Sequence, residues 1–196
     1  AYLAPNRARN LAAAHVRTPY VVFVDNDVLV APGWLDALVE CADATSAWAV
    51  GPLCQQGPWR ADEVHLAGGE ARIEGEAGGR RLVERQAHLG ARVADVRPSL
   101  VRRPTELVEF HAVLVRLDAL AKVGGLDEDL RSVGEHTDFC LRVREAGGAV
   151  EAEGVARSLR LLSEAELVLY VVDGTLGVSP SAEDEAFLAR RPDAVR

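Results

Sequence analysis

Two short acidic segments carry most of the chemistry that this sequence offers. The first is Asp25-Asn26-Asp27, which directly follows the apolar run 20–24. Two carboxylates one residue apart at the end of a buried strand can supply oxygen ligands to a divalent cation, and the cation can then bind a diphosphate. The alternative is structural, because Asp and Asn also end strands through Asx turns. The motif alone favours the structural interpretation.

The second segment is Glu135-His136-Thr137-Asp138, at the start of an expected helix. Glu135 and Asp138 are i, i+3 neighbours, so both carboxylates face one way at the helix end where the dipole favours negative charge. A carboxylate in a crevice can take a proton from an attacking hydroxyl. The alternative is an acidic first turn in which Asp138 pairs with Arg142, and this segment alone favours that alternative.

Other reactive residue types form no recognisable pattern. His65, His88 and His111 are scattered without H-x-x-x-H spacing, which predicts that they form no metal site. Neither a G-x-S-x-G nucleophile elbow nor a phosphate-binding P-loop occurs. The three cysteines, Cys41, Cys54 and Cys140, contain no C-x-x-C pair, so we expect no disulfide framework and a reducing compartment.

Hydrophobic periodicity predicts an α/β fold that positions these segments. The run 20–24 is typical of a buried, parallel strand, and Leu107 to Val115 alternates as another strand. The stretch 52–100 is rich in Gly, Arg and Glu, which favours loops with short strands near 64–66 and 71–73. The remaining expected elements are helices at 6–15, 34–40, 117–123 and 135–146 and strands at 47–51 and 149–153.

Composition excludes several classes of protein. The 196 residues are 48% hydrophobic and 27% charged, which is typical of a chain with a core. The net charge of −8 argues against a nucleic-acid partner, so an anionic ligand needs local arginines or a metal. No apolar run approaches the ~18 residues of a transmembrane segment. The chain contains no methionine, which predicts that it is a piece of a longer product.

Taken in order, several motifs resemble family 2 glycosyltransferases of the GT-A fold, over about residues 6–150. The motifs are Asn6 with Ala8-Arg9-Asn10, the strand 20–24 with the D-x-D motif Asp25-Asn26-Asp27, Pro32-Gly33-Trp34-Leu35, Val50-Gly51-Pro52, Gly124-Gly125-Leu126-Asp127-Glu128, and Glu135 to Arg142 with Ala146-Gly147-Gly148. The resemblance implies a GT-A-like mixed sheet flanked by helices in a partial domain, 1–153. It also implies N-terminal truncation, because the family begins with further strands that bind the base of the donor.

The resemblance implies inverting transfer of a sugar from a nucleotide-diphosphate sugar to a hydroxyl group of a glycan or lipid-linked acceptor. Asp25, Asn26 and Asp27 would bind the donor, with Mg²⁺ or Mn²⁺ held by Asp27 and Asp25. Glu135, His136 and Asp138 are alternatives for the general base, because His136 stands where the family commonly has a second acid. Trp34, Asp127 and Glu128 would lie on the acceptor side.

Two further expectations concern the localisation of the protein and its C-terminal residues. The resemblance implies a cytoplasmic protein that can act at the inner membrane face, although no basic amphipathic helix supports membrane contact. Residues 154–196 form an extension of uncertain origin, in which the apolar run 167–172 and the helix after Ser181 resemble a GTPase segment without its nucleotide-binding motifs. A non-catalytic domain that keeps the sheet and has lost donor binding is the alternative to a transferase.

Overall fold

The computed structural model describes residues 3–57, 62–76, 79–130 and 134–153. Its main sheet has the strand order β1-β8-β2-β9-β7 and is mixed, because β2 runs parallel to β9 while β1 pairs antiparallel with β8. The strands are β1 (Tyr20–Val24), β2 (Ala49–Gly51), β7 (Arg103–Pro104), β8 (Ala112–Arg116) and β9 (Val150–Ala152). This confirms the prediction of an α/β fold with a mixed sheet flanked by helices.

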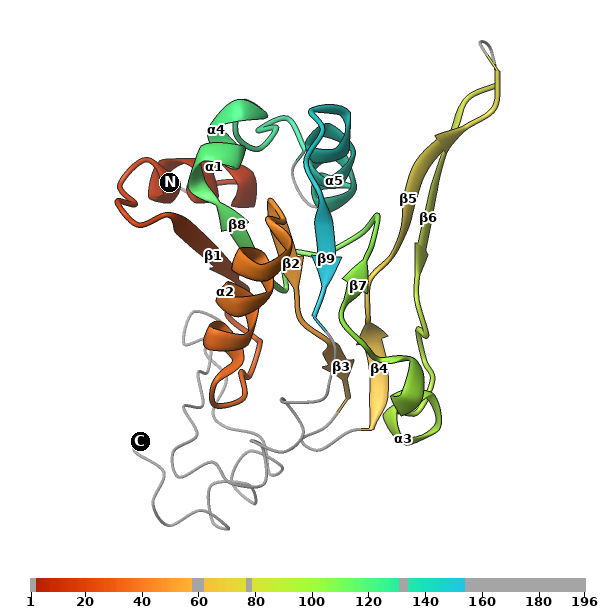
Figure 1. Ribbon diagram of the computed structural model, residues 1–196. Coiled ribbons are helices and arrows are strands. Elements are labelled where there is room, and N and C mark those ends of the chain that lie inside the picture. Colours follow the sequence, from red (N-terminus) through yellow and green to blue (C-terminus); the bar gives the residue numbers. More distant parts are fainter. Residues whose placement is uncertain (1–2, 58–61, 77–78, 131–133, 154–196) are drawn as a thin grey trace, which may run out of the picture.

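Helices cover both faces of this sheet (Figure 1). On one face, Leu38 and Cys41 of α2 (Trp34–Thr45) pack against Val50 and Leu114. On the other face lie α1 (Pro5–Ala13), α4 (Leu117–Lys122) and α5 (Glu135–Glu145), which contribute to the larger core cluster. Strand alternation explains the division, since Val113 and Val115 join the larger cluster whereas Leu114 joins the smaller. Among the described helices, none is both long and apolar enough to span a membrane.

The middle of the chain contains more regular structure than we expected. Two antiparallel hairpins form there, the second of which projects as a long arm beside α5 (Figure 1). Their strands are β3 (Cys54–Gln56), β4 (Glu63–Leu66), β5 (Gly69–Glu74) and β6 (Arg81–Gln86), followed by α3 (Val93–Val96) and the short 3₁₀ helix η1 (Arg97–Ser99). The short strands expected near 64–66 and 71–73 are confirmed as β4 and β5, whereas β3, β6 and α3 were not expected.

Two details of the expected strands are also wrong. β1 is antiparallel to β8, and β8 is its single strand neighbour within the described residues. An apolar run indicates that both faces of a strand are covered, but it does not indicate whether the strand runs parallel or antiparallel to its neighbour. The expected strand 107–115 begins only at Ala112, because Leu107 to Phe110 are buried without strand geometry. The extension 154–196, with its GTPase-like segment, lies outside the described residues.

Candidate functional site

The antiparallel register of β1 and β8 determines what lies beside the first acidic residue. Val24 pairs with Ala112, so the next position outward sets Asp25 opposite His111. The backbone N–H of Asp25 donates to the carbonyl of His111 at 3.0 Å. The side chains meet as well, with His111 Nδ1 3.2 Å from Asp25 Oδ2. Strand pairing alone thus places a histidine against the carboxylate.

Arg9 of α1 holds the other oxygen of this carboxylate. Its Nη2 donates to Asp25 Oδ1 at 3.0 Å, and its guanidinium carbon lies 4.5 Å from the centre of the Phe110 ring. The hydrogen bond from His111 and the charge of Arg9 lower the pKa of Asp25 despite partial burial. Asn26 and Asp27 are exposed. Within the described residues, the Asp27 carboxylate has no hydrogen bond or ion pair, so it is open to a ligand.

A buried carboxylate, Glu109, lies behind His111. Its side chain is only 5% exposed, and its Oε2 lies 3.1 Å from His65 Nε2 and 3.2 Å from His111 Nε2. Its Oε1 accepts a hydrogen bond from Gln86 Nε2 at 2.9 Å. The two histidine Nε2 atoms lie 3.1 Å apart. These residues come from β4, β6 and the segment before β8, which meet at this point.

Opposite charges shift the pKa values of this cluster. Burial by itself would raise the pKa of Glu109, but hydrogen bonds from His111 and Gln86 and the nearby charges of His136 and His65 lower it to about 2. Hydrogen bonds to Asp25 and Glu109 raise the pKa of His111 to about 10, against the opposing effect of burial. In the absence of another cation, His111 is therefore an imidazolium between two carboxylates.

The second acidic segment begins α5, and its side chains differ in whether they have hydrogen-bond partners. Glu135 Oε2 and His136 Nε2 are buried with no hydrogen-bond partner among the described residues, although His136 Nε2 lies 3.5 Å from Glu84 Oε1. Asp138 Oδ2 accepts hydrogen bonds from Nε and Nη2 of Arg142 at 2.8 and 2.6 Å. The i, i+4 pair that we considered as the structural alternative is therefore present. Glu135 and His136 retain unused hydrogen-bonding capacity.

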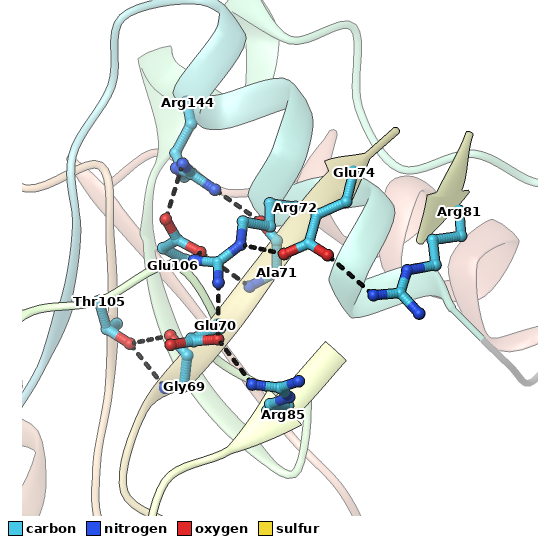
Figure 2. Close-up of polar contacts among 10 residues, drawn as sticks. All are labelled: Gly69, Glu70, Ala71, Arg72, Glu74, Arg81, Arg85, Thr105, Glu106 and Arg144. Atoms are coloured by element: carbon cyan, nitrogen blue, oxygen red, sulfur yellow. Dashed lines mark hydrogen bonds and ion pairs between the residues drawn. The ribbon is translucent and has the colours of Figure 1, made fainter. Parts of the chain in front are cut away.

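The projecting hairpin is tied to α5, which fixes β6 against the start of this helix. Figure 2 shows Arg144 of α5 donating to the carbonyl of Ala71 at 2.6 Å and to Glu106 Oε1 at 3.1 Å. Along the hairpin, Arg72 pairs with Glu70 and Glu74 at 3.1 and 3.0 Å. These contacts position Glu84 and Gln86, the two β6 side chains that reach the cluster. Thr137 of α5 also donates to Glu84.

The expected acceptor-side residues make contacts of their own. Trp34 packs with the apolar residues beneath α2. Asp127 and Glu128 lie in an exposed turn that two asparagines of α1 hold in place. Asn6 Nδ2 donates to the carbonyl of Asp127 at 2.7 Å, and Asn10 Nδ2 donates to Glu128 Oε1 at 3.1 Å. The described residues provide no contact that joins these three residues to Glu109.

Several residues of the site were missed from the sequence. His65 and His111 are scattered in the sequence, but they lie side by side in the structure, because hairpin and sheet pairing brings together residues far apart in the chain. Glu109 carried no signal, since a lone glutamate in an apolar run fits no motif. Cys140 of α5 fixes this segment, with its Sγ 3.4 Å from the backbone N of Val108 and 3.5 Å from its carbonyl O. Burial raises the pKa of Cys140 to about 12, so it acts as a neutral thiol.

Comparison with known proteins shows that the chain is similar to glycosyltransferases. Residues 3–93 match the family model described as glycosyl transferase family 2. The chain is also 34% identical over 156 residues to proteins named pre-mycofactocin glycosyltransferase from two strains of Mycobacterium tuberculosis, CDC 1551 / Oshkosh and H37Rv. The alignment covers 78% of this chain and 29% of each relative. The chain thus spans less than a third of the length of these relatives.

Proposed function

The chain belongs to glycosyl transferase family 2, and we propose from this premise that it transfers a sugar from a nucleotide-diphosphate sugar to a hydroxyl group of an acceptor. The observation that carries the proposal is the acidic motif at the end of β1. There Asp25 is fixed by Arg9 and His111, while Asp27 two residues on remains open.

Asp25 and Asp27 are not equally available to bind the cation of a diphosphate. Both oxygens of Asp25 are already used, by Arg9 at 3.0 Å and by His111 at 3.2 Å. A cation at Asp25 would have to displace or approach these positive groups. Asp27 meets no such obstacle and would hold Mg²⁺ or Mn²⁺, with Asp25 orienting the donor and Asn26 offering an amide beside it. The bound ion supplies positive charge that stabilises the departing nucleoside diphosphate.

The start of α5 supplies the proposed general base. Glu135 and His136 keep oxygen and nitrogen atoms without hydrogen-bond partners, so either group can accept a proton from the attacking hydroxyl. Asp138 is a weaker alternative, because Arg142 occupies one of its oxygens twice. Attack from the face opposite the leaving group gives inversion at the anomeric carbon. Direct displacement needs one base and no covalent sugar intermediate, which fits these residues.

The acceptor is proposed only as a class. The relatives' name states that they act on pre-mycofactocin, and they are more than three times as long as the aligned part. For this chain we propose a hydroxyl-bearing glycan or lipid-linked acceptor. Trp34, Asp127 and Glu128 remain proposed acceptor contacts, since their exposed or half-buried side chains are available to a ligand.

Nucleotide binding tests this function. We expect one of UDP, GDP and dTDP to raise the melting temperature of the chain in the presence of Mn²⁺ and not in its absence. A ligand at about 100 times its Kd adds about 2.7 kcal/mol to the free energy of unfolding. For a chain of this length that corresponds to a rise of about 5–10 °C. Asp27→Asn should abolish the rise, because the amide cannot replace the charged cation ligand.

Asp36→Asn is the matched control, since Asp36 is an exposed aspartate in the first turn of α2. It should leave the nucleotide-dependent rise unchanged. If a cooperatively melting chain responds to none of the nucleotides, the transferase proposal fails in favour of a non-catalytic domain. An equal response in Asp27→Asn would place the nucleotide away from the acidic motif.

A further inference from the structure

Three potential metal ligands converge at the junction of β4 and the segment before β8. His65 Nε2, His111 Nε2 and Glu109 Oε2 form a triangle with sides of 3.1, 3.1 and 3.2 Å. Ligands of a tetrahedral ion with bonds of about 2.0–2.1 Å lie about 3.3–3.4 Å apart. The triangle therefore needs only small adjustments to bind such an ion on one side of its plane.

Hydrogen bonds at the Nδ1 atoms of both histidines favour metal binding at their Nε2 atoms. His111 Nδ1 faces Asp25 Oδ2 at 3.2 Å, and His65 Nδ1 faces Gln56 Oε1 at 2.9 Å. Gln56 donates through its own Nε2 to Glu63, which confirms that its oxygen faces the ring. Each Nδ1 is thus the donor, and in a neutral ring the Nε2 lone pair is left to point at the other histidine.

Glu109 is supported in the same way. Gln86 donates to its Oε1 at 2.9 Å, which leaves Oε2 for the histidines. Each of the three ligands therefore has an outer partner that fixes its orientation, as is usual at metal sites. A single proton on His111 satisfies one pair of the converging atoms, whereas a divalent ion satisfies all three.

We propose that His65, Glu109 and His111 bind a divalent transition-metal ion of the Zn²⁺ type. Two imidazoles and one carboxylate are preferred by Zn²⁺ and Fe²⁺ over Mg²⁺ and Ca²⁺. This site is distinct from the proposed donor cation at Asp27, with which it shares no ligand, and Asp25 lies between them as the outer partner of His111.

A three-ligand site keeps room for a ligand that the protein does not supply. His65 and His111 side chains are 27% and 40% exposed, so solvent reaches the ion from their side. His136 Nε2 is buried without a hydrogen-bond partner, and it forms a second group with Glu84 and Glu109 whose ligand atoms lie within 4.8 Å of one another. The open position can thus accept water or another oxygen ligand.

Zinc titration of the metal-stripped chain tests the proposal without any nucleotide. We expect calorimetry to show one Zn²⁺ bound per chain, with binding that weakens as the pH falls and protons compete for the histidines. His65→Gln should weaken binding by about 100-fold or more. Gln56→Ala should weaken it by about 10–100-fold, because it removes only the outer partner of His65.

His15→Gln is the matched control, because His15 is an exposed histidine whose side chain makes no hydrogen bond within the described residues. It should bind Zn²⁺ as the unmodified chain does. Absence of binding, or equal affinity in His65→Gln and the control, overturns the proposal. Co²⁺ absorption gives an independent readout, since a thiolate charge-transfer band would place the ion on a cysteine and overturn it too. Failure of nucleotide binding does not affect these results.

Discussion

His111 is the residue whose ionisation should most affect stability in the metal-free chain. Its pKa is raised to about 10 from 6.5, so its pairing with Asp25 and Glu109 stabilises the fold fully below about pH 6.5. That contribution should be lost as the pH rises through about 10. Urea denaturation across this interval should show a falling free energy of unfolding. In His111→Gln the fall should be much smaller.

The Glu109 carboxylate has the opposite dependence. Its pKa is lowered to about 2 from 4.5, so its contribution is present above about pH 4.5 and lost as the pH falls toward 2. If the unmodified chain and His111→Gln lose stability equally between neutral and alkaline pH, then His111 is not charged between the two carboxylates.

Asp25 and Glu135 could be predicted as candidate site residues from the sequence. His111 and Glu109 could not be predicted, because their positions in the cluster depend on strand pairing.

At the scale of elements, the hairpin β5–β6 positions the side chains that reach Glu109. A Cβ added at Gly69 would lie 2.2 Å from the carbonyl oxygen of Arg85 on the facing strand. Backbone cannot move aside without changing the pairing, so Gly69→Ala should lower the free energy of unfolding by about 1–3 kcal/mol. Gly79→Ala is the control on the same hairpin, because a Cβ there meets nothing within 4 Å. Equal urea midpoints for the two variants would contradict this account.

The elements differ in how readily the sequence reveals them. β1 and α5 were predicted because an apolar run and a helical segment stopped by two glycines are local signals. β6 was missed, because Arg81–Gln86 is mostly polar and forms a strand through backbone pairing with β5 along its whole length. Arg81 pairs with Glu74 at 3.1 Å, a contact that exists only after the strands have paired. Polar strands of this kind leave no hydrophobic period in the sequence.

Across the whole molecule, arginine side chains hydrogen-bond to backbone carbonyls of distant segments. Arg116 donates to the carbonyls of Ala42 and Ala47, and Arg142 donates to those of Val123 and Gly125. A guanidinium can bind several carbonyl oxygens at once, which a lysine ammonium does less well. Lys122 is the only lysine among the 22 basic residues of the sequence, and these contacts explain part of that preference for arginine. The fold class was predictable, whereas the strand order was not, because sheet order depends on contacts between distant segments.

We propose that the acidic motif after β1 is the donor site, and hydrogen–deuterium exchange can locate that site directly. With Mn²⁺ and the nucleotide that raises the melting temperature, backbone amides of residues 25–30 should exchange more slowly, while those of the β5–β6 arm should not change. Asp27→Asn should lose this protection. Protection that persists in Asp27→Asn, or that falls elsewhere and spares residues 25–30, would contradict the account.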